Sequence, residues 1–158
     1  MHIALVETAG ARSIMKGTIH EINDRYYLVV EEGTITRWYP VVYENWTWAF
    51  HERVGGDVYG NDLFLRDIVG FIADDGSRKV GIVFEDEELG FSIREITSVA
   101  NGSIEWRDGE DYCLSSDAVR RLGTTLEPDF NEIEIFLSGR SIETDRMLAA
   151  KKIEAVQG

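Results

Sequence analysis

The sequence predicts a mainly β protein with a minor α content. Segments rich in β-branched and aromatic residues recur at short intervals and are separated by Gly, Asn and Asp, which is typical of strands joined by tight turns. Pro occurs only twice in the 158 residues, so no Pro-rich linker is expected. With 44% hydrophobic and 28% charged residues, the composition is that of an ordinary folded domain.

The first 40 residues predict an N-terminal β meander. Its expected strands and turns, in order, are Ile3–Glu7, Ala9-Gly10, Ser13–Ile22, Asn23-Asp24, Tyr26–Val30, Glu32-Gly33 and Thr34–Trp38. A helix over residues 12–22 is the alternative for one segment, because Ile14, Thr18 and Ile22 also share a helical face. Gly17 weakens that helix, and the β-branched and aromatic content favours strands.

Aromatic residues crowd the segment around Pro40. The alternation of Trp46, Trp48 and Phe50 predicts a strand with three rings on one face. Rings at this density suit a core, a subunit interface or a ligand groove. The candidate interface residues are Trp38, Tyr39, Tyr43, Trp46, Trp48 and Phe50.

Three glycines between positions 55 and 60 predict a loop and a domain boundary. We expect an N-terminal β lobe over residues 1–52 and a second domain over residues 53–158. The strands expected in the second domain are Asp67–Ile72, Lys79–Phe84, Phe91–Glu95, Ser103–Trp106 and Tyr112–Leu114, with turns at Asp74-Asp75-Gly76 and Asp108-Gly109. Such short strands indicate a small, strongly bent barrel of the SH3-like kind.

Two helices are expected toward the C-terminus. Ser116–Gly123 has an N-cap residue and a terminal Gly, which predict a helix of about two turns. A C-terminal helix is expected from Ser141, because apolar residues share one face, acidic residues occupy its first turn and Lys151-Lys152 lie near its end. The residues of that face are Ile142, Arg146, Ala149, Ala150 and Ile153. Between the two helices, alternation over Ile133–Leu137 predicts a half-buried strand.

The charge of the chain restricts its partners. Sixteen basic and 29 acidic residues give a formal net charge of −13. Such a charge repels a phosphate backbone unless the basic residues cluster, and here they occur singly or in pairs such as Arg120-Arg121. Direct binding of nucleic acid is therefore not expected. The acidity either provides solubility or imitates DNA toward a nucleic-acid-binding protein.

The N-terminus and the cysteine count predict the compartment. Cys113 is the only cysteine, so no intramolecular disulfide forms, and the N-terminus lacks the basic start and apolar run of a signal peptide. No apolar run approaches the ~20 residues that span a bilayer. We therefore expect a cytoplasmic protein without a membrane partner.

The sequence does not predict a catalytic, cofactor or metal site. His2, His20 and His51 are widely separated and have no partner at zinc-ligand spacing, and no phosphate-binding or nucleophile motif occurs. Asp74-Asp75 and Glu85–Glu88 would be calcium ligands if their turns met, but solvated turns account for such acids far more often. A non-enzymatic protein without cofactors is expected.

The segment from Asp57 to Val69, DVYGNDLFLRDIV, resembles the D-x-x-G-x-x-(I/L)-(F/Y)-x-x-D-(I/V)-V hallmark of the YopX family of phage and prophage proteins. Val80–Phe84 and Gly90–Arg94 are similar to the family's next strands in order and spacing, and residues 130–148 match it loosely. The resemblance implies a mainly β, phage-encoded and self-associating protein of the host cytoplasm, without an established activity.

The hallmark also has a physical interpretation. Gly60 suits a turn with positive φ, and Asp67 is placed to accept backbone N–H groups at the start of a strand. The apolar hallmark residues expected in the core are Leu63, Phe64, Ile68 and Val69. We therefore expect a structural motif in a protein that acts by protein contact, as a homo-oligomer and with a host protein partner. The alternative is an acidic inhibitor that imitates DNA.

Overall fold

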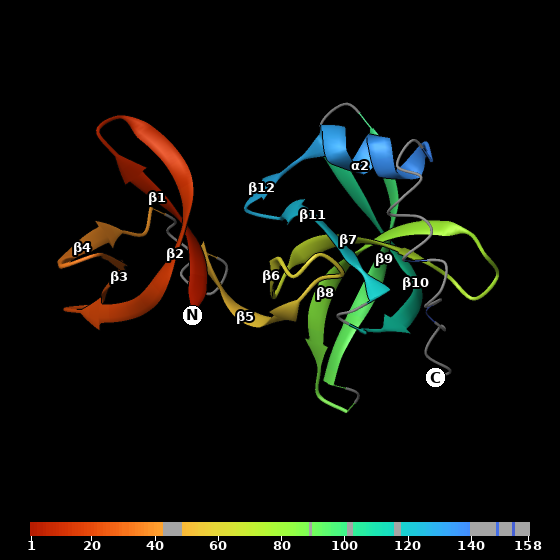
Figure 1. Ribbon diagram of the computed structural model, residues 1–158, viewed down its shortest axis with the longest axis horizontal. Helices are drawn as coiled ribbons and strands as arrows, with labels where there is room; N and C mark the ends of the chain where they lie inside the picture. Colours follow the sequence, from red (N-terminus) through yellow and green to blue (C-terminus); the bar gives the residue numbers. More distant parts are fainter. Residues whose placement is uncertain are drawn as a thin grey trace. The chain divides into compact units, whose positions relative to one another are not determined.

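The computed structural model describes residues 1–42, 49–88, 90–100, 103–115, 118–139, 148 and 153, with backbone alone for residues 97–100 and 103–109. The protein is mainly β, as predicted, with antiparallel sheets and one short helix, α2, that lies entirely within the described residues. The chain divides into two compact units, Met1–Arg53 and Val54–Gly158 (Figure 1). This division lies one residue after the boundary expected from the glycines.

The first unit is a β meander. Its strands are β1 (His2–Thr8), β2 (Ala11–Ile22), β3 (Arg25–Glu32), β4 (Ile35–Pro40) and the first part of β5 (Phe50–Gly56), and their order in the sheet is β4-β3-β2-β1-β5. The helix considered for residues 12–22 is a strand. Ala9-Gly10 and Asn23-Asp24 each form a two-residue turn in which both residues have positive φ, and such turns match the twist of a hairpin.

The strand β2 bends between two partners at Gly17. Gly17 lies opposite His2 of β1, and the next residue, Thr18, lies opposite Val29 of β3. A Cβ atom added to Gly17 would lie 2.3 Å from the carbonyl oxygen of Val29, so only glycine allows the strands to approach this closely. Glycine therefore weakens a helix here and permits the bend.

The strands of the first unit curl around one core. After β4 the chain returns to β1, where Val41 forms a β-bridge with Val6. The buried residues of this core are Ala4, Val6, Leu28, Val41 and Ala49. A strongly bent barrel was predicted for the second domain. In the first unit, β2 bends so that its first part pairs with β1 and its second part with β3.

The second unit contains a sheet whose strands follow the order β10-β9-β8-β7-β11-β12. Its elements are β6 (Asp62–Phe64), β7 (Asp67–Ile72), β8 (Arg78–Asp86), β9 (Gly90–Ala100), β10 (Ser103–Cys113), β11 (Arg120–Thr124), β12 (Glu127–Pro128) and α2 (Phe130–Leu137). The predicted hairpin is confirmed, because β7 and β8 pair with Ile68 opposite Ile82.

Both faces of β7 are covered, and all six of its residues are buried. On one face, Val69 and Phe71 pack with Leu63 and Tyr112. The other face packs against α2, which lies over the sheet in Figure 1. A Cβ atom at Gly70 would lie 2.7 Å from the ring of Phe136, so this glycine lets the helix lie close to the strand.

The prediction of a strand over Ile133–Leu137 was wrong, because these residues belong to α2. Asp129 caps the helix by accepting a hydrogen bond from the N–H of Glu132 at 3.1 Å. Ile133 and Phe136, three residues apart, are the side chains that α2 buries. The predicted strand would have buried Leu137, which is exposed, and exposed Phe136, which is buried.

The prediction of a short helix over Ser116–Gly123 was also wrong. Arg120–Thr124 form β11, which pairs with β7 and satisfies the edge of a fully buried strand. A single strand, β10, replaces the hairpin expected around Asp108-Gly109, and its register against β9 shifts between Trp106 and Asp111.

The helix expected from Ser141 lies mostly outside the described residues, although Leu148, which is described, is helical. Ile153, which was expected on one face of that helix, instead forms a parallel β-bridge with Ala73. Its backbone N–H donates to the carbonyl of Ile72 at 2.9 Å, so the bridge completes hydrogen bonds at the end of β7.

Candidate functional site

Three rings gather on the outer face of the sheet formed by β2, β3 and β4 in the first unit. The ring centroid of Trp38 lies 5.2 Å from that of His20 and 6.1 Å from that of Tyr27. Trp38 keeps 47% of its surface exposed, although folded proteins usually bury most of a Trp side chain. These three residues form what we name the aromatic cluster.

The register of the strands brings the aromatic cluster together. His20 of β2 lies opposite Tyr27 of β3, and Val29 of β3 lies opposite Trp38 of β4. Because side chains alternate between the two faces of a strand, the aromatic cluster falls on one face and the fully buried Leu28 on the other. The cluster is therefore on the face that points away from the core.

More apolar surface and few charges surround the aromatic cluster. Ile22, which follows His20 along the same face of β2, is 47% exposed. The hydroxyl oxygen of Thr18 lies 3.3 Å from Nε2 of His20 and orients that ring. β3 places two charged residues on this face, Arg25 and Glu31, whose opposite charges cancel. This part of the face is therefore neutral, although the whole chain has a net charge of −13.

The predicted interface residues are not all brought together. Trp38 belongs to the aromatic cluster, but Tyr39 and Phe50 pack against the core of the first unit. The ring of Phe50 lies 5.3 Å from that of Tyr26. Tyr43, Trp46 and Trp48 lie outside the described residues.

His20 and Tyr27 were not among the site residues predicted from the sequence. The signal was present in the turn Asn23-Asp24, because a two-residue turn makes Ile22 the partner of Arg25. Moving two residues away from the turn along each strand places His20 opposite Tyr27, on the same face as Ile22 and Arg25.

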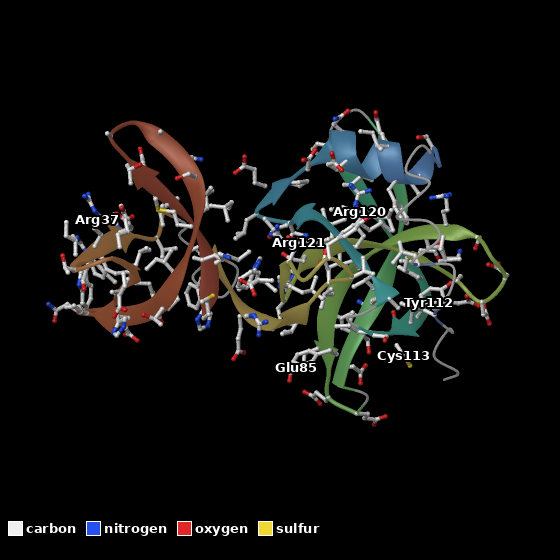
Figure 2. All side chains as sticks on the ribbon, viewed as in Figure 1. Arg37, Glu85, Tyr112, Cys113, Arg120 and Arg121 are labelled. Atoms are coloured by element: carbon white, nitrogen blue, oxygen red, sulfur yellow. The ribbon has the colours of Figure 1, made fainter. Side chains whose placement is uncertain are left out.

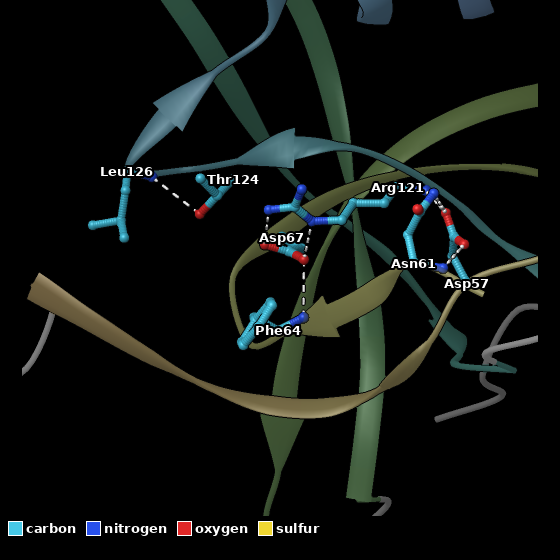
Figure 3. Close-up of polar contacts among 7 residues, drawn as sticks. All are labelled: Asp57, Asn61, Phe64, Asp67, Arg121, Thr124 and Leu126. Carbon is cyan, nitrogen blue, oxygen red and sulfur yellow. Dashed lines mark hydrogen bonds and ion pairs between the residues drawn. The ribbon is translucent and has the colours of Figure 1, made fainter. Parts of the chain in front are cut away.

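In the second unit, Asp57 organises the loop between β5 and β6. Its Oδ1 accepts hydrogen bonds from the backbone N–H groups of Tyr59 and Asn61, both at 2.9 Å. Its Oδ2 accepts a hydrogen bond from the N–H of Arg121 at 2.9 Å, which holds the loop against β11 (Figure 3). Gly60 in this loop has φ of 81°, the conformation predicted for it.

Asp67 is the most enclosed charged residue of the hallmark segment, with 0% of its surface exposed. Its Oδ2 accepts hydrogen bonds from the N–H of Phe64 at 2.9 Å and from Nε of Arg121 at 2.7 Å (Figure 3). The bond from Phe64 is the predicted role of Asp67, and it closes the turn between β6 and β7. Arg121 was not among the predicted site residues, because only the fold brings together residues 54 positions apart.

Burial raises the pKa of Asp67 from its ordinary value of 3.8 to about 6, because a carboxylate removed from water loses the hydration of its charge. The hydrogen bond and the charge of Arg121 lower this pKa, as does the hydrogen bond from Phe64, but they only partly offset burial. The result is an ion pair between a fully buried carboxylate and a partly exposed guanidinium group.

The hallmark segment is a core element. Leu63, Phe64, Ile68 and Val69 are each at most 1% exposed, which confirms that they fill the interior. Their side chains leave Asp67 enclosed among apolar groups and hydrogen-bonded to its neighbours. The segment thus has the structural role that its physical interpretation predicted.

The acidic turns considered for calcium do not meet. Asp74-Asp75 and Glu87-Glu88 lie at opposite ends of β8, whose nine residues span about 30 Å. Glu85 lies near the second of these turns (Figure 2). Within the described part of the chain, no three His, Cys, Asp or Glu residues are grouped as metal ligands would be. The calcium alternative is therefore wrong.

Comparisons with known proteins give no match: no family model, curated protein or solved structure is similar to this chain. The resemblance to the YopX family, carried by Asp57–Val69, stays a prediction. Within the described ranges, no helix has both the length and the hydropathy needed to cross a bilayer.

Proposed function

We propose that this chain is a phage-encoded, non-enzymatic protein that acts through protein–protein contact and self-association. The observation that carries the proposal is the aromatic cluster, in which Trp38 remains 47% exposed on an ordered sheet between two other rings. The phage origin is proposed from the resemblance of Asp57–Val69 to the YopX hallmark.

The aromatic cluster has the properties of an interface anchor. Trp and Tyr side chains contribute most of the binding free energy at many protein interfaces, because they remove a large apolar surface from water. Ring contacts with His20 and Tyr27 already fix the position of Trp38, so little side-chain entropy would be lost on binding. A host protein is a further partner that this surface would contact.

An acidic inhibitor that imitates DNA is the second candidate, and the concentration of negative charge in the second unit is the observation that favours it. Seven of the 29 acidic residues and five of the 16 basic residues precede position 54, so the formal charge is −2 for the first unit and −11 for the second. Among the described residues of the second unit, the exposed acids other than Glu110 of β10 lie at two opposite turns and around α2, rather than in one row. Protein contact through the first unit is therefore the better supported function.

Replacement of Trp38 tests the proposal. We expect Trp38→Ala to raise the dissociation constant of self-association about thirtyfold, which is the effect of an interface anchor. Sedimentation equilibrium over a concentration series measures this constant. Phe91→Ala is the matched control, because Phe91 is an exposed ring in the second unit, at 41%, and should leave the constant unchanged. A wild-type chain that stays monomeric at the highest concentration would contradict self-association.

A further inference from the structure

We infer that two copies of this chain associate face to face through the outer surface of the sheet formed by β2, β3 and β4. The two-fold axis of this contact runs across the strands at the level of Leu28. The inference rests on the proposed function and specifies how self-association occurs. It follows from the closed edge beside the aromatic cluster and from the order of charges and rings on the outer face.

The edge of β4 beside the aromatic cluster is closed within the chain. Val41, which follows Pro40, forms a β-bridge with Val6, and the N–H of Val42 donates to the carbonyl of Leu5 at 3.5 Å. β1 therefore covers this end of β4. A second copy that reaches the aromatic cluster must contact the face of the sheet rather than its edge.

The outer face of the sheet is accessible. The strand register and the alternation of side chains define its residues, and all of them except Tyr27 and Val29 are exposed. The residues of the outer face are Thr18, His20 and Ile22 of β2, Arg25, Tyr27, Val29 and Glu31 of β3, and Thr36, Trp38 and Pro40 of β4.

Two opposite charges lie at equal distances from the centre of the outer face. Arg25 lies three residues before Leu28 on β3, and Glu31 lies three residues after it. They are about 20 Å apart along the strand, so they do not pair within one copy. Among the described residues, no ion pair involves either of them. Two such faces are complementary when one is turned end to end on the other.

The two-fold axis across the strands brings these opposite charges together. It stacks the two β3 strands in opposite directions, so Arg25 of each copy faces Glu31 of the other. An axis along the strands would stack β3 in the same direction. It would then place Arg25 on Arg25 and Glu31 on Glu31, which is unfavourable. The charges therefore select the axis across the strands.

The same axis suits the rings. Trp38 lies at the level of Val29, and Pro40 lies at the level of Tyr27. The axis exchanges these two levels, so Trp38 of each copy covers Pro40 of the other. Packed sheets cross at about 30°, which displaces a residue about 10 Å from the axis by about 5 Å. The side chain of Arg25 is long enough to span that displacement.

Rings and charges have different roles in this contact. Exposed ion pairs contribute little binding free energy, whereas rings that are removed from water contribute much. The rings around Trp38 therefore hold the copies together, and Arg25 and Glu31 set their orientation. Because the contact is isologous, it closes on itself and gives a dimer rather than a filament.

Charge reversal tests the orientation. Arg25→Glu and Glu31→Arg each place like charges together at both ends of the interface. We expect each variant to raise the dimer dissociation constant about tenfold in sedimentation equilibrium. Net charge alone predicts opposite effects, because the first substitution makes the charge of −13 more negative and the second makes it less negative. Circular dichroism checks that both variants fold.

Combining the two substitutions should restore the contact. The double variant Arg25→Glu/Glu31→Arg keeps the net charge of −13 and should associate as tightly as the wild type. An equimolar mixture of the two single variants should form dimers with one copy of each, because both ion pairs are then restored. Sedimentation of the mixture with one variant fluorescently labelled detects these dimers.

Arg37→Glu is the matched control for Arg25→Glu, because it makes the same change of charge on the opposite face of β4 from Trp38. There, Nε of Arg37 pairs with Glu32 of its own chain at 3.1 Å. We expect this variant to change the dissociation constant about twofold or less at about 0.15 M salt, which screens long-range repulsion. An increase as large as that caused by Arg25→Glu would overturn the inferred orientation.

The outcomes separate the inference from the proposed function. Weaker association of both single variants, with recovery in the double variant and in the mixture, supports the face-to-face contact. Effects that follow net charge, or an absence of recovery, overturn this contact. Self-association through the aromatic cluster then stands if Trp38→Ala still weakens it. A wild-type chain that is monomeric at all concentrations overturns both.

Discussion

Asp67 illustrates how a single buried carboxylate links the fold to pH. Burial lifts its pKa to about 6, while the pKa in the unfolded chain is 3.8. Between these values the folded state binds more protons than the unfolded state, so the free energy of unfolding decreases as the pH rises. This contribution is complete below about pH 4, is lost above about pH 6 and amounts to about 3 kcal/mol.

The variant Asp67→Asn removes this titration and should change the pH profile of stability. We expect the wild-type free energy of unfolding, measured relative to that of the variant, to fall by about 2 to 3 kcal/mol between about pH 4 and pH 6. Urea unfolding of both proteins at several pH values measures the difference, in which the contributions of the other carboxylates cancel. Parallel profiles for the two proteins would show that burial does not shift the pKa of Asp67.

Gly70 makes a second residue-scale prediction, because α2 lies directly over it. The Cβ atom of Gly70→Ala would meet the ring of Phe136 at 2.7 Å, and we expect a loss of about 1 to 3 kcal/mol from the free energy of unfolding. Gly56→Ala is the control, since the nearest atom to its added Cβ lies 3.6 Å away. Urea denaturation should show a lower midpoint for the first variant only, and equal midpoints would mean that α2 shifts away at little cost.

At the scale of elements, the bend in β2 controls the first unit. Gly17→Ala brings a Cβ atom to 2.3 Å from the backbone carbonyl of Val29, which no side-chain rotation relieves. We expect the first unit to lose about 2 kcal/mol or more of stability. Three of the four Trp residues precede position 54, so Trp fluorescence during urea unfolding reports mainly on this unit. The Gly70→Ala variant, which perturbs the second unit, is the matched control.

Local signals predicted some elements and failed for others. The turns Ala9-Gly10 and Asn23-Asp24 join strands that are adjacent in sequence, so turn chemistry alone placed β1, β2 and β3. β11 depends on the unpaired edge of β7, about 50 residues earlier, and no local pattern carries that information. Ile133–Leu137 fits both a strand and a helix by periodicity, and the cap at Asp129 decides between them.

The candidate site, like the fold, could be predicted from the sequence only in part. Trp38 was identified from the density of rings, and counting register from the turns would have added His20 and Tyr27. The same reasoning could not separate Tyr39, which faces the core, from Trp38, since adjacent residues in a strand face opposite sides and only the fold shows which side is buried. The pair formed by Asp67 and Arg121 depends entirely on tertiary structure.

At the scale of the whole molecule, charge opposes self-association. Each copy carries a formal charge of −13, with −11 assigned to the second unit, so two copies repel each other at long range. Salt screens this repulsion, because the Debye length falls from about 14 Å at 0.05 M to about 4 Å at 0.5 M ionic strength. The proposed contact through the apolar aromatic cluster would keep its strength over that range.

We therefore expect added salt to strengthen self-association several-fold between about 0.05 M and 0.5 M NaCl, as measured by sedimentation equilibrium. A function based on imitation of DNA makes the opposite prediction, since the attraction between an acidic surface and a basic partner weakens as salt is added. Replacing Glu87 and Glu88 by Gln reduces the repulsion and should reduce the effect of salt on the dissociation constant. Self-association that weakens with salt would show that charge pairs, rather than the rings around Trp38, join the copies.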